Sequence, residues 1–252
     1  MDRNRVIGGS IIMAQQVSHD RKMSPLLLLT AATGLVDAVS YIGLGHVFTA
    51  NMTGNVVLLG FAFVGTPGLS VFRSLTALVA FLIGGVLGGR IFTRLAAIST
   101  TRWITASFGS EAIFLLAATA VSVGFRPLIN VFRLYVLIVL TGLAMGVRNA
   151  TVRKLAVPDL TTTVLTLTIS GLAADSSLAG GSNPRWQRRV LSILVMLSGA
   201  ALGARLSRLC LALPLGLATV SALCSLAAFY AERQELGTVA DAQKGTESTR
   251  SH

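Results

Sequence analysis

The chain has 252 residues, of which 53% are hydrophobic and 12% charged, and its mean hydropathy is +0.73. A soluble domain carries about twice that share of charged residues, so we exclude a water-soluble globule. Lys and Arg outnumber Asp and Glu by 21 to 10. Because these bases lie between apolar runs, they indicate loops facing an anionic cytoplasmic membrane surface rather than a nucleic-acid interface. The sequence predicts an all-α integral membrane protein.

Residues 1–24 predict a cytoplasmic N-terminal tail of low structural content, without the pattern of a cleaved signal peptide. Residues 231–252 are polar and predict a disordered C-terminal tail. Between the tails lie six apolar runs that are long enough, or nearly so, to cross about 30 Å of hydrocarbon as helices. They are Leu26–His46, Val71–Gly89, Ile104–Gly124, Val131–Val147, Val190–Ala204 and Leu209–Tyr230.

Two shorter apolar runs, Asn51–Gly65 and Leu160–Ala174, fall between these spans. Each would be about 22 Å long as a helix, too short for a comfortable crossing. If all eight runs crossed, 13 Lys and Arg would lie inside and 8 outside; if the short runs return to the side they came from, the division is 16 to 5. The second division obeys the positive-inside rule better. We therefore predict six transmembrane helices plus two re-entrant half-helices in the cell inner membrane, with both termini cytoplasmic.

An internal duplication relates the two halves of the chain. Thr33–Leu35 aligns with Thr141–Leu143 at an offset of 108, and Gly84–Arg90 aligns with Gly199–Arg205 at an offset of 115. Three crossings are an odd number, so the second copy must be inverted relative to the first. The prediction is two inverted-topology repeats, residues 25–124 and 125–230. This plan is typical of transporters and channels whose substrate sites lie near the membrane midplane, and we expect one repeat to rock against the other.

Two motifs carry a family resemblance. The first contains Asp37, then Tyr41, then an Asn-Met-Thr-Gly-Asn box at residues 51–55; the second runs from Val157 to Thr166. Over residues 25–230 the chain resembles the YoaK-like membrane proteins, a family known as domain of unknown function 1275. The resemblance implies a bacterial multi-span membrane protein and brings no established activity.

The two short runs open with polar residues that suit a solute site. If each run enters extended and returns as a helix, both helix N-termini point at the membrane centre, where their free N–H groups suit an anion or a polar neutral solute. The alternative is that the first residue of each run is an ordinary N-cap with no further role. The predicted substrate-binding residues are Asn51, Thr53, Gly54 and Asn55 in the first run, and Asp159, Thr161, Thr162 and Thr163 in the second.

Asp37 lies near the middle of the first span, where a carboxylate is costly unless it is paired or neutral. We predict that it is a proton-coupling site or that it receives a hydrogen bond from Arg148; alternatively, it is a protonated or locally paired residue that fixes helix packing. Tyr41, Glu111 and Arg148 are secondary candidates. Glu111 is shallower in its span, which favours a pore or packing role.

Glycines spaced four residues apart predict closely packed helix backbones, either between the two repeats or across a homodimer. These packing residues are Gly84, Gly85, Gly88, Gly89, Gly199 and Gly203.

The sequence contains none of the familiar hydrolase, metalloprotease or phosphate-loop motifs. We therefore expect no enzyme activity, no catalytic residues, no metal, no cofactor and no nucleic-acid partner. The expected partners are the lipid bilayer and a small solute of unknown identity. The predicted function is a transporter or channel for a small polar or anionic solute, with proton coupling through Asp37. The alternative is a non-transporting membrane scaffold or interaction protein.

Overall fold

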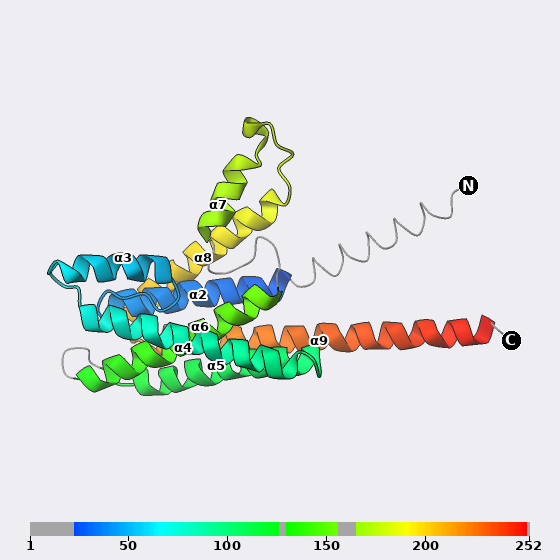
Figure 1. Ribbon diagram of the computed structural model, residues 1–252, viewed down its shortest axis with the longest axis horizontal. Coiled ribbons are helices and arrows are strands. Elements are labelled where there is room, and N and C mark those ends of the chain that lie inside the picture. Colours follow the sequence, from blue (N-terminus) through cyan, green and yellow to red (C-terminus); the bar gives the residue numbers. More distant parts are fainter. Residues whose placement is uncertain (1–22, 126–129, 156–164, 251–252) are drawn as a thin grey trace.

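The computed structural model describes residues 23–125, 130–155 and 165–250, and the side chains of residues 25–125, 130–155 and 165–231. All regular elements within these ranges are helices (Figure 1). They are α2 (Met23–Gly43), α3 (Met52–Phe63), α4 (Val71–Leu95), α5 (Thr100–Ser122), α6 (Val131–Leu155), α7 (Leu165–Ala174), the short 3₁₀-helix η1 (Ser177–Ala179), α8 (Trp186–Ser207) and α9 (Ala212–Arg250).

Six of these helices are long and apolar enough to cross a membrane: α2, α4, α5, α6, α8 and the first half of α9. They confirm the six predicted spans. The helices α4 and α6 run well past their predicted ends, to Leu95 and Leu155. Their last turns carry basic side chains, which favour a helix C-terminus because of its partial negative charge. The two short apolar runs form the shorter helices α3 and α7.

The C-terminal part of α9 differs from the prediction. The helix continues to Arg250 and extends beyond the bundle (Figure 1), where the sequence predicted a disordered tail. The residues after Tyr230 include many Ala, Glu, Gln, Lys and Arg, which have high intrinsic helix propensity. The polarity that suggested disorder is thus compatible with a helix.

Three buried apolar clusters lie in series along the bundle and give the directions of α2, α4, α5, α6 and α9. One cluster joins the beginning of α2 to the end of α6, through Leu29 and Val152. Another joins the end of α2 to the beginnings of α4 and α6, through Val39, Ala77 and Leu137. We call the end where α2 begins the N-side and the opposite end the far side. Because α2 ends and α4 begins on the far side, the chain between them, including α3, leaves and returns at that side.

The most extensive helix contacts join different halves of the chain, α4 with α6 and α2 with α8. Glycines permit these contacts: a Cβ added at Gly84 would meet the backbone of Leu143, and one added at Gly199 would meet the backbone of Ala31. Gly88 and Gly203 lie in the same interfaces. These glycine contacts also show that α4 runs parallel to α6, and α2 parallel to α8.

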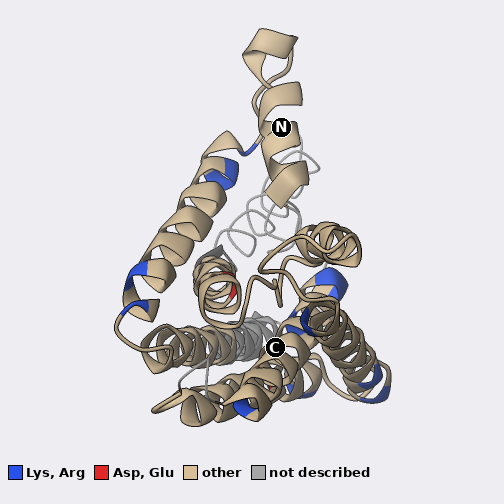
Figure 2. Ribbon diagram, turned by 90° about the vertical axis from the view of Figure 1, so that its left-hand side faces the viewer, with Lys and Arg blue, Asp and Glu red and all other residues tan. Residues whose placement is uncertain are grey.

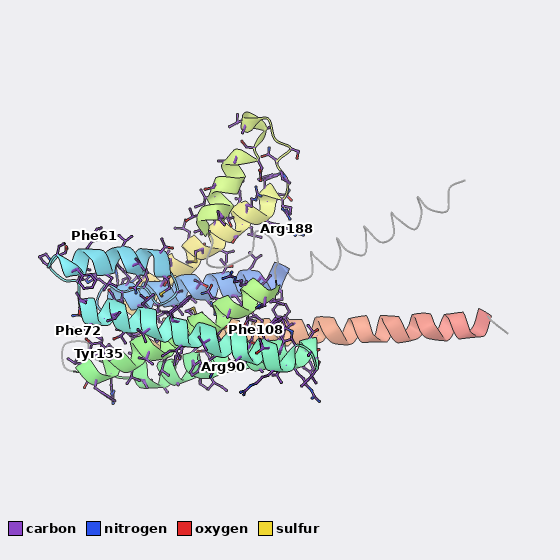
Figure 3. The ribbon with its side chains drawn as sticks, in the orientation of Figure 1. Phe61, Phe72, Arg90, Phe108, Tyr135 and Arg188 are labelled. Atoms are coloured by element: carbon purple, nitrogen blue, oxygen red, sulfur yellow. The ribbon has the colours of Figure 1, made fainter. Side chains whose placement is uncertain are left out.

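Apolar side chains cover the outside of the bundle. Phe72 of α4 is 74% exposed and Phe61 of α3 is 51% exposed, and both project outward in Figure 3. Charged residues are sparse over the helices seen along the bundle axis in Figure 2. Among the side chains that the structure describes, the acids are Asp37, Glu111 and Asp175. Such an apolar surface fits contact with the lipid bilayer.

Candidate functional site

The non-helical chain between α2 and α3 is anchored on Asp37. The Oδ1 atom of Asp37 accepts hydrogen bonds from the backbone N–H groups of Ala50, at 3.0 Å, and Asn51, at 3.3 Å. Asp37 lies in the last third of α2, before its final turn, so α3 begins beside that part of α2 and points toward the far side (Figure 1). This carboxylate therefore determines how deep in the bundle α3 begins.

Two further side chains hold the same stretch of chain. Asn55 is fully buried; its Oδ1 accepts from the N–H of Phe48 at 3.3 Å, and its Nδ2 donates to the carbonyl of Ser74 at 2.9 Å. Arg73 donates to the carbonyl of Gly45 at 3.1 Å, where a φ of 87° favours glycine. Non-helical backbone within a membrane needs such internal partners, because lipid supplies none.

The first turn of α3 is capped by Asn51, whose Oδ1 accepts from the N–H of Gly54 at 3.2 Å. The preceding N–H groups of a first turn have no partner inside the helix, which leaves those of Met52 and Thr53 available on the side of a neighbouring cavity. Asn51 is therefore an N-cap, as the alternative interpretation of this residue expected. This role is compatible with a solute bound at the same turn.

A cavity of about 790 Å³ adjoins this first turn. It lies between α3, α4 and α6, and runs from the start of α3 toward the N-side ends of α4 and α6. Its lining residues are Ala50, Asn51, Met52, Thr53, Phe81, Gly85, Gly89, Gly146, Asn149, Ala150, Arg153 and Lys154. The cavity gives the beginning of α3 a path toward the N-side.

A buried ion pair lies beside this region. Arg148 of α6 donates from Nε to Oε1 of Glu111 on α5 at 2.9 Å, and its Nη2 bonds the same oxygen. Its Nη1 donates to the carbonyl of Leu29 and to Oγ1 of Thr33 on α2, both at 2.9 Å. Arg148 and Glu111 are fully buried. The pair joins three helices, and each buried charge lies against an opposite charge, as a buried ion requires.

Two details of the predicted site are corrected by this ion pair. Arg148 does not donate to Asp37, because its guanidinium points at Glu111 and at the first turns of α2. Glu111 is not near one end of its span, because α5 begins at Thr100 and Glu111 lies at its middle. As the buried partner of Arg148 it has a packing role. Four side-chain oxygens in this interior have no hydrogen-bond partner among the described residues: Asp37 Oδ2, Thr49 Oγ1, Ser107 Oγ and Glu111 Oε2.

The predicted substrate-binding residues divide into three groups. Asn51 and Thr53 line the cavity, whereas Gly54 lies against Phe48, and Asn55 is occupied by the contacts that hold the chain. The four residues of the second run, Asp159, Thr161, Thr162 and Thr163, lie outside the described residues.

Tyr41 lies near the end of α2, beside the non-helical chain that leads into α3. Its ring stacks on Phe48 with ring centroids 5.1 Å apart and meets the ring of His46 edge-on. It does not line the cavity. These contacts support the conformation of the non-helical chain.

Two of the predicted packing glycines have a different environment. A Cβ added at Gly85 or Gly89 would meet nothing within 4 Å, and both residues line the cavity. They are one residue along from Gly84 and Gly88, so they face about 100° away from the α6 interface on a helix of 3.6 residues per turn.

Sequence reasoning missed the α6 wall of the cavity. Gly146, Asn149 and Arg153 are spaced three and four residues apart, which puts them on one helix face. This spacing is visible in the sequence, but Arg153 and Lys154 were used there only in the count of basic residues on each side of the membrane.

Comparison with known proteins agrees with the architecture. Residues 25–230 match a family model described as DUF1275, protein of unknown function. The chain belongs to the DUF1275 family. It is 37% identical over 155 residues to the UPF0700 transmembrane protein YoaK of Bacillus subtilis (strain 168), covering 60% of this chain and 66%, just under two thirds, of YoaK. No solved structure matches the chain. The predicted YoaK-like family and multi-pass membrane character are thus confirmed.

Proposed function

We propose that this DUF1275 protein is a membrane transporter or channel for a small polar or anionic solute, and that the solute binds in the cavity at the beginning of α3. The observation that carries the proposal is the cavity itself. It lies within a bundle of membrane-spanning helices and reaches the N-terminus of a short helix. Interrupted helices that begin at membrane depth are typical of solute and ion sites in transporters.

The proposal treats α3 as a re-entrant half-helix. Its twelve residues extend about 18 Å, much less than the roughly 30 Å of a hydrocarbon core. It starts at the depth of Asp37, and the chain on either side of it is connected to the far side. These observations favour a helix that enters the membrane and returns over one that crosses.

The inverted repeats belong to the same proposal, and the helix contacts support them. In the repeats α2 corresponds to α6, α4 to α8 and α5 to α9. The contact of α4 with α6 then corresponds to the contact of α8 with α2, and the contact of α5 with α9 corresponds to itself. All three are major contacts. Individual glycine contacts match as well. Gly34 lies against Met196, Gly199 and Ala200, and Gly146 lies against Phe81, Gly84 and Gly85.

These matched contacts pair the residues of the two halves at an offset that differs from the sequence alignment. Gly34 and Gly146 are 112 residues apart, four more than the offset of 108 found by alignment, whereas the offset of 115 for α4 and α8 is unchanged. Four residues are about one helical turn, so the same face of the helix is retained. In the new register Asp37 corresponds to Asn149, which lines the cavity.

We assign the N-side to the cytoplasm of a bacterial inner membrane. Arg94, Arg153 and Lys154 lie in last turns that end on the N-side, and cytoplasmic ends carry the excess of bases in most membrane proteins. With this orientation the cavity is open toward the cytoplasm.

Asp37 is the proton-coupling residue of the proposal. Its ionised carboxylate makes stronger hydrogen bonds to the N–H groups of Ala50 and Asn51 than a neutral acid would. Protonation would loosen the beginning of α3 and so change the cavity that the solute occupies.

The test is uptake by proteoliposomes across a panel of small anions and neutral metabolites, with and without an imposed pH gradient. The wild-type protein should transport at least one solute in a pH-dependent manner. Asp37→Asn, which keeps an acceptor oxygen but no titratable group, should insert normally and lose the pH dependence. Asp175→Asn, an acid on the loop after α7 with a 45% exposed side chain, is the matched control. Absence of uptake for every solute would contradict transport and favour a scaffold.

A further inference from the structure

The charged side chains that line the cavity, in the part of the chain that the structure describes, are cations. Arg153 and Lys154 lie near its N-side end, and Asn51, Thr53 and Asn149 provide its neutral polar groups. Among the described residues that line the cavity, none carries a carboxylate. Asp37 is close in space to the beginning of α3, but it lies behind the chain, with Oδ1 bonded to the backbone of Ala50 and Asn51. The electrostatic character of the cavity is therefore positive.

The two cations differ in their surroundings. The Nζ atom of Lys154 lies 4.8 Å from the ring centroid of Phe92, a cation–π contact at the edge of the bundle. Arg153 has no carboxylate partner in the part of the chain that the structure describes, whereas Arg148 is paired with Glu111. Arg153 is thus the guanidinium available to a ligand, and its planar fork suits a carboxylate or an oxyanion.

Arg153 continues a line of donors along the cavity. Asn149 lies one turn deeper on the same face of α6; one N–H of its Nδ2 bonds the carbonyl of Met145 at 2.9 Å, which leaves a second N–H for the cavity. The free N–H groups of Met52 and Thr53 lie at the deep end. An anion that entered from the N-side would meet donors from Arg153 to the beginning of α3.

The opposite wall leaves room for such an ion. Gly85 and Gly89 of α4 line the cavity, and a Cβ added at either would meet nothing within 4 Å. By contrast, Gly84 and Gly88 are packed against α6. The space beside Gly85 therefore belongs to the cavity, and a larger side chain there would fill it without disturbing the helix interface.

We infer that the cavity is selective for small anions with carboxylate or phosphate-like oxygens, and that Arg153 is the residue that sets this selectivity. The inference rests on the proposed function only in using the same cavity as the solute site; binding of an anion can be measured without transport.

The binding test uses thermal unfolding of the purified, detergent-solubilised full-length protein at constant ionic strength. Inorganic phosphate, acetate and the neutral solute glycerol are the probes. Phosphate or acetate should raise the melting temperature saturably, and glycerol at the same concentrations should not. Arg153→Gln should weaken the apparent affinity at least tenfold. Arg94→Gln removes an exposed base from the last turn of α4 that does not line the cavity, and it should bind as the wild type does.

A second pair of variants tests the location. Gly85→Leu should fill the cavity and abolish the anion effect, whereas Gly109→Leu, on an open face of α5, should keep it. Equal losses in Arg153→Gln and Arg94→Gln would overturn the inference in favour of general surface charge. A shift with phosphatidylglycerol but not with free phosphate or acetate would overturn it in favour of a lipid headgroup.

The two proposals fail in different ways. Uptake of a neutral solute without any anion effect on unfolding would overturn anion selectivity and leave transport standing. Anion binding that requires Arg153, in a protein that transports nothing, would support the anion site and contradict the proposed function.

Discussion

Asp37 and Glu111 are both carboxylates inside the helix bundle, but their partners are of different kinds. Asp37 is bonded to backbone N–H groups of a non-helical segment, whereas Glu111 is bonded to the guanidinium of Arg148. A carboxylate that holds backbone amides controls the position of a segment. A carboxylate that neutralises a buried cation holds helices together. The first arrangement can respond to a proton by releasing a segment, and the second cannot do so without exposing a buried positive charge.

The ion pair leads to a prediction about stability. Arg148→Met leaves Glu111 without its cation, and Glu111→Leu leaves Arg148 without its anion, so each single variant should lower the free energy of unfolding by about 3–5 kcal/mol. The double variant Arg148→Met/Glu111→Leu should regain much of that loss, since neither charge then remains buried. Denaturation in detergent micelles measures all three variants. A double variant as unstable as the sum of the two single variants would contradict direct pairing.

These residue contacts could be predicted only in part. The position of Asp37 inside an apolar run was enough to mark it, because an acid at that depth is costly. Its partners were not predictable, since they depend on the path of residues 44–50. Arg148 follows directly after the predicted span and was predicted to donate a hydrogen bond to Asp37. Its partner Glu111 is 37 residues earlier on another helix, and hydrophobic periodicity carries no information on such pairs.

At the scale of elements, the accessibility of the two ends of α3 distinguishes a re-entrant helix from a helix that crosses the membrane. In the proposed arrangement Thr53, on the cavity, is accessible from the N-side, and Val64, which is 83% exposed just after α3, is accessible from the far side. If α3 crossed, the two accessibilities would be exchanged. The same two positions therefore give opposite results under the two topologies.

We predict this pattern for cysteine labelling in oriented membrane vesicles. Cys210 and Cys224 are first replaced by Ser, and Thr53→Cys and Val64→Cys are treated with a membrane-impermeant thiol reagent. Thr53→Cys should react from the N-side and Val64→Cys from the far side. Leu178→Cys, at a 99% exposed position in η1, serves as the N-side reference. Labelling of Val64→Cys on the same side as Leu178→Cys would show that α3 crosses.

The existence of α3 followed from local signals, namely an Asn before an apolar run that was too short to cross. The depth of its start did not follow from them, because Asp37 and Asn55 set it through contacts across the bundle. The cavity was missed for a related reason. It is lined by three helices, and its outline depends on which of two neighbouring glycines, Gly84 or Gly85, faces α6.

For the whole molecule, the distribution of bases predicts an orientation that fusion proteins can test. A fluorescent protein fused after residue 252 should fluoresce, and alkaline phosphatase at the same position should be inactive, because the proposed N-side is cytoplasmic and helices of an inner-membrane protein follow the positive-inside rule. A truncation after Gly124, where α5 has reached the far side, should give the reverse results. Identical results at both positions would contradict an odd number of crossings between Gly124 and the C-terminus.

The number of spans and the odd count in each half were predictable, because hydropathy and charge are properties of single segments. The way in which the halves combine was not. The expectation that one repeat rocks against the other assumes that residues 25–124 and 125–230 are separate bodies. The contacts are instead most extensive between the halves. Small residues in the sequence indicated close packing, but they could not identify the partner helix.

The parallel glycine-lined pairs determine which parts of this protein can move as rigid bodies. A rotation that separated the two halves of the chain would open the contacts of Gly84 with Leu143 and of Gly199 with Ala31 together. The α2–α8 and α4–α6 pairs can each move intact, because each contains its own close contacts. The units of motion are then composite bodies, each built from one helix of either half. The boundary between such bodies therefore differs from the boundary between residues 25–124 and 125–230.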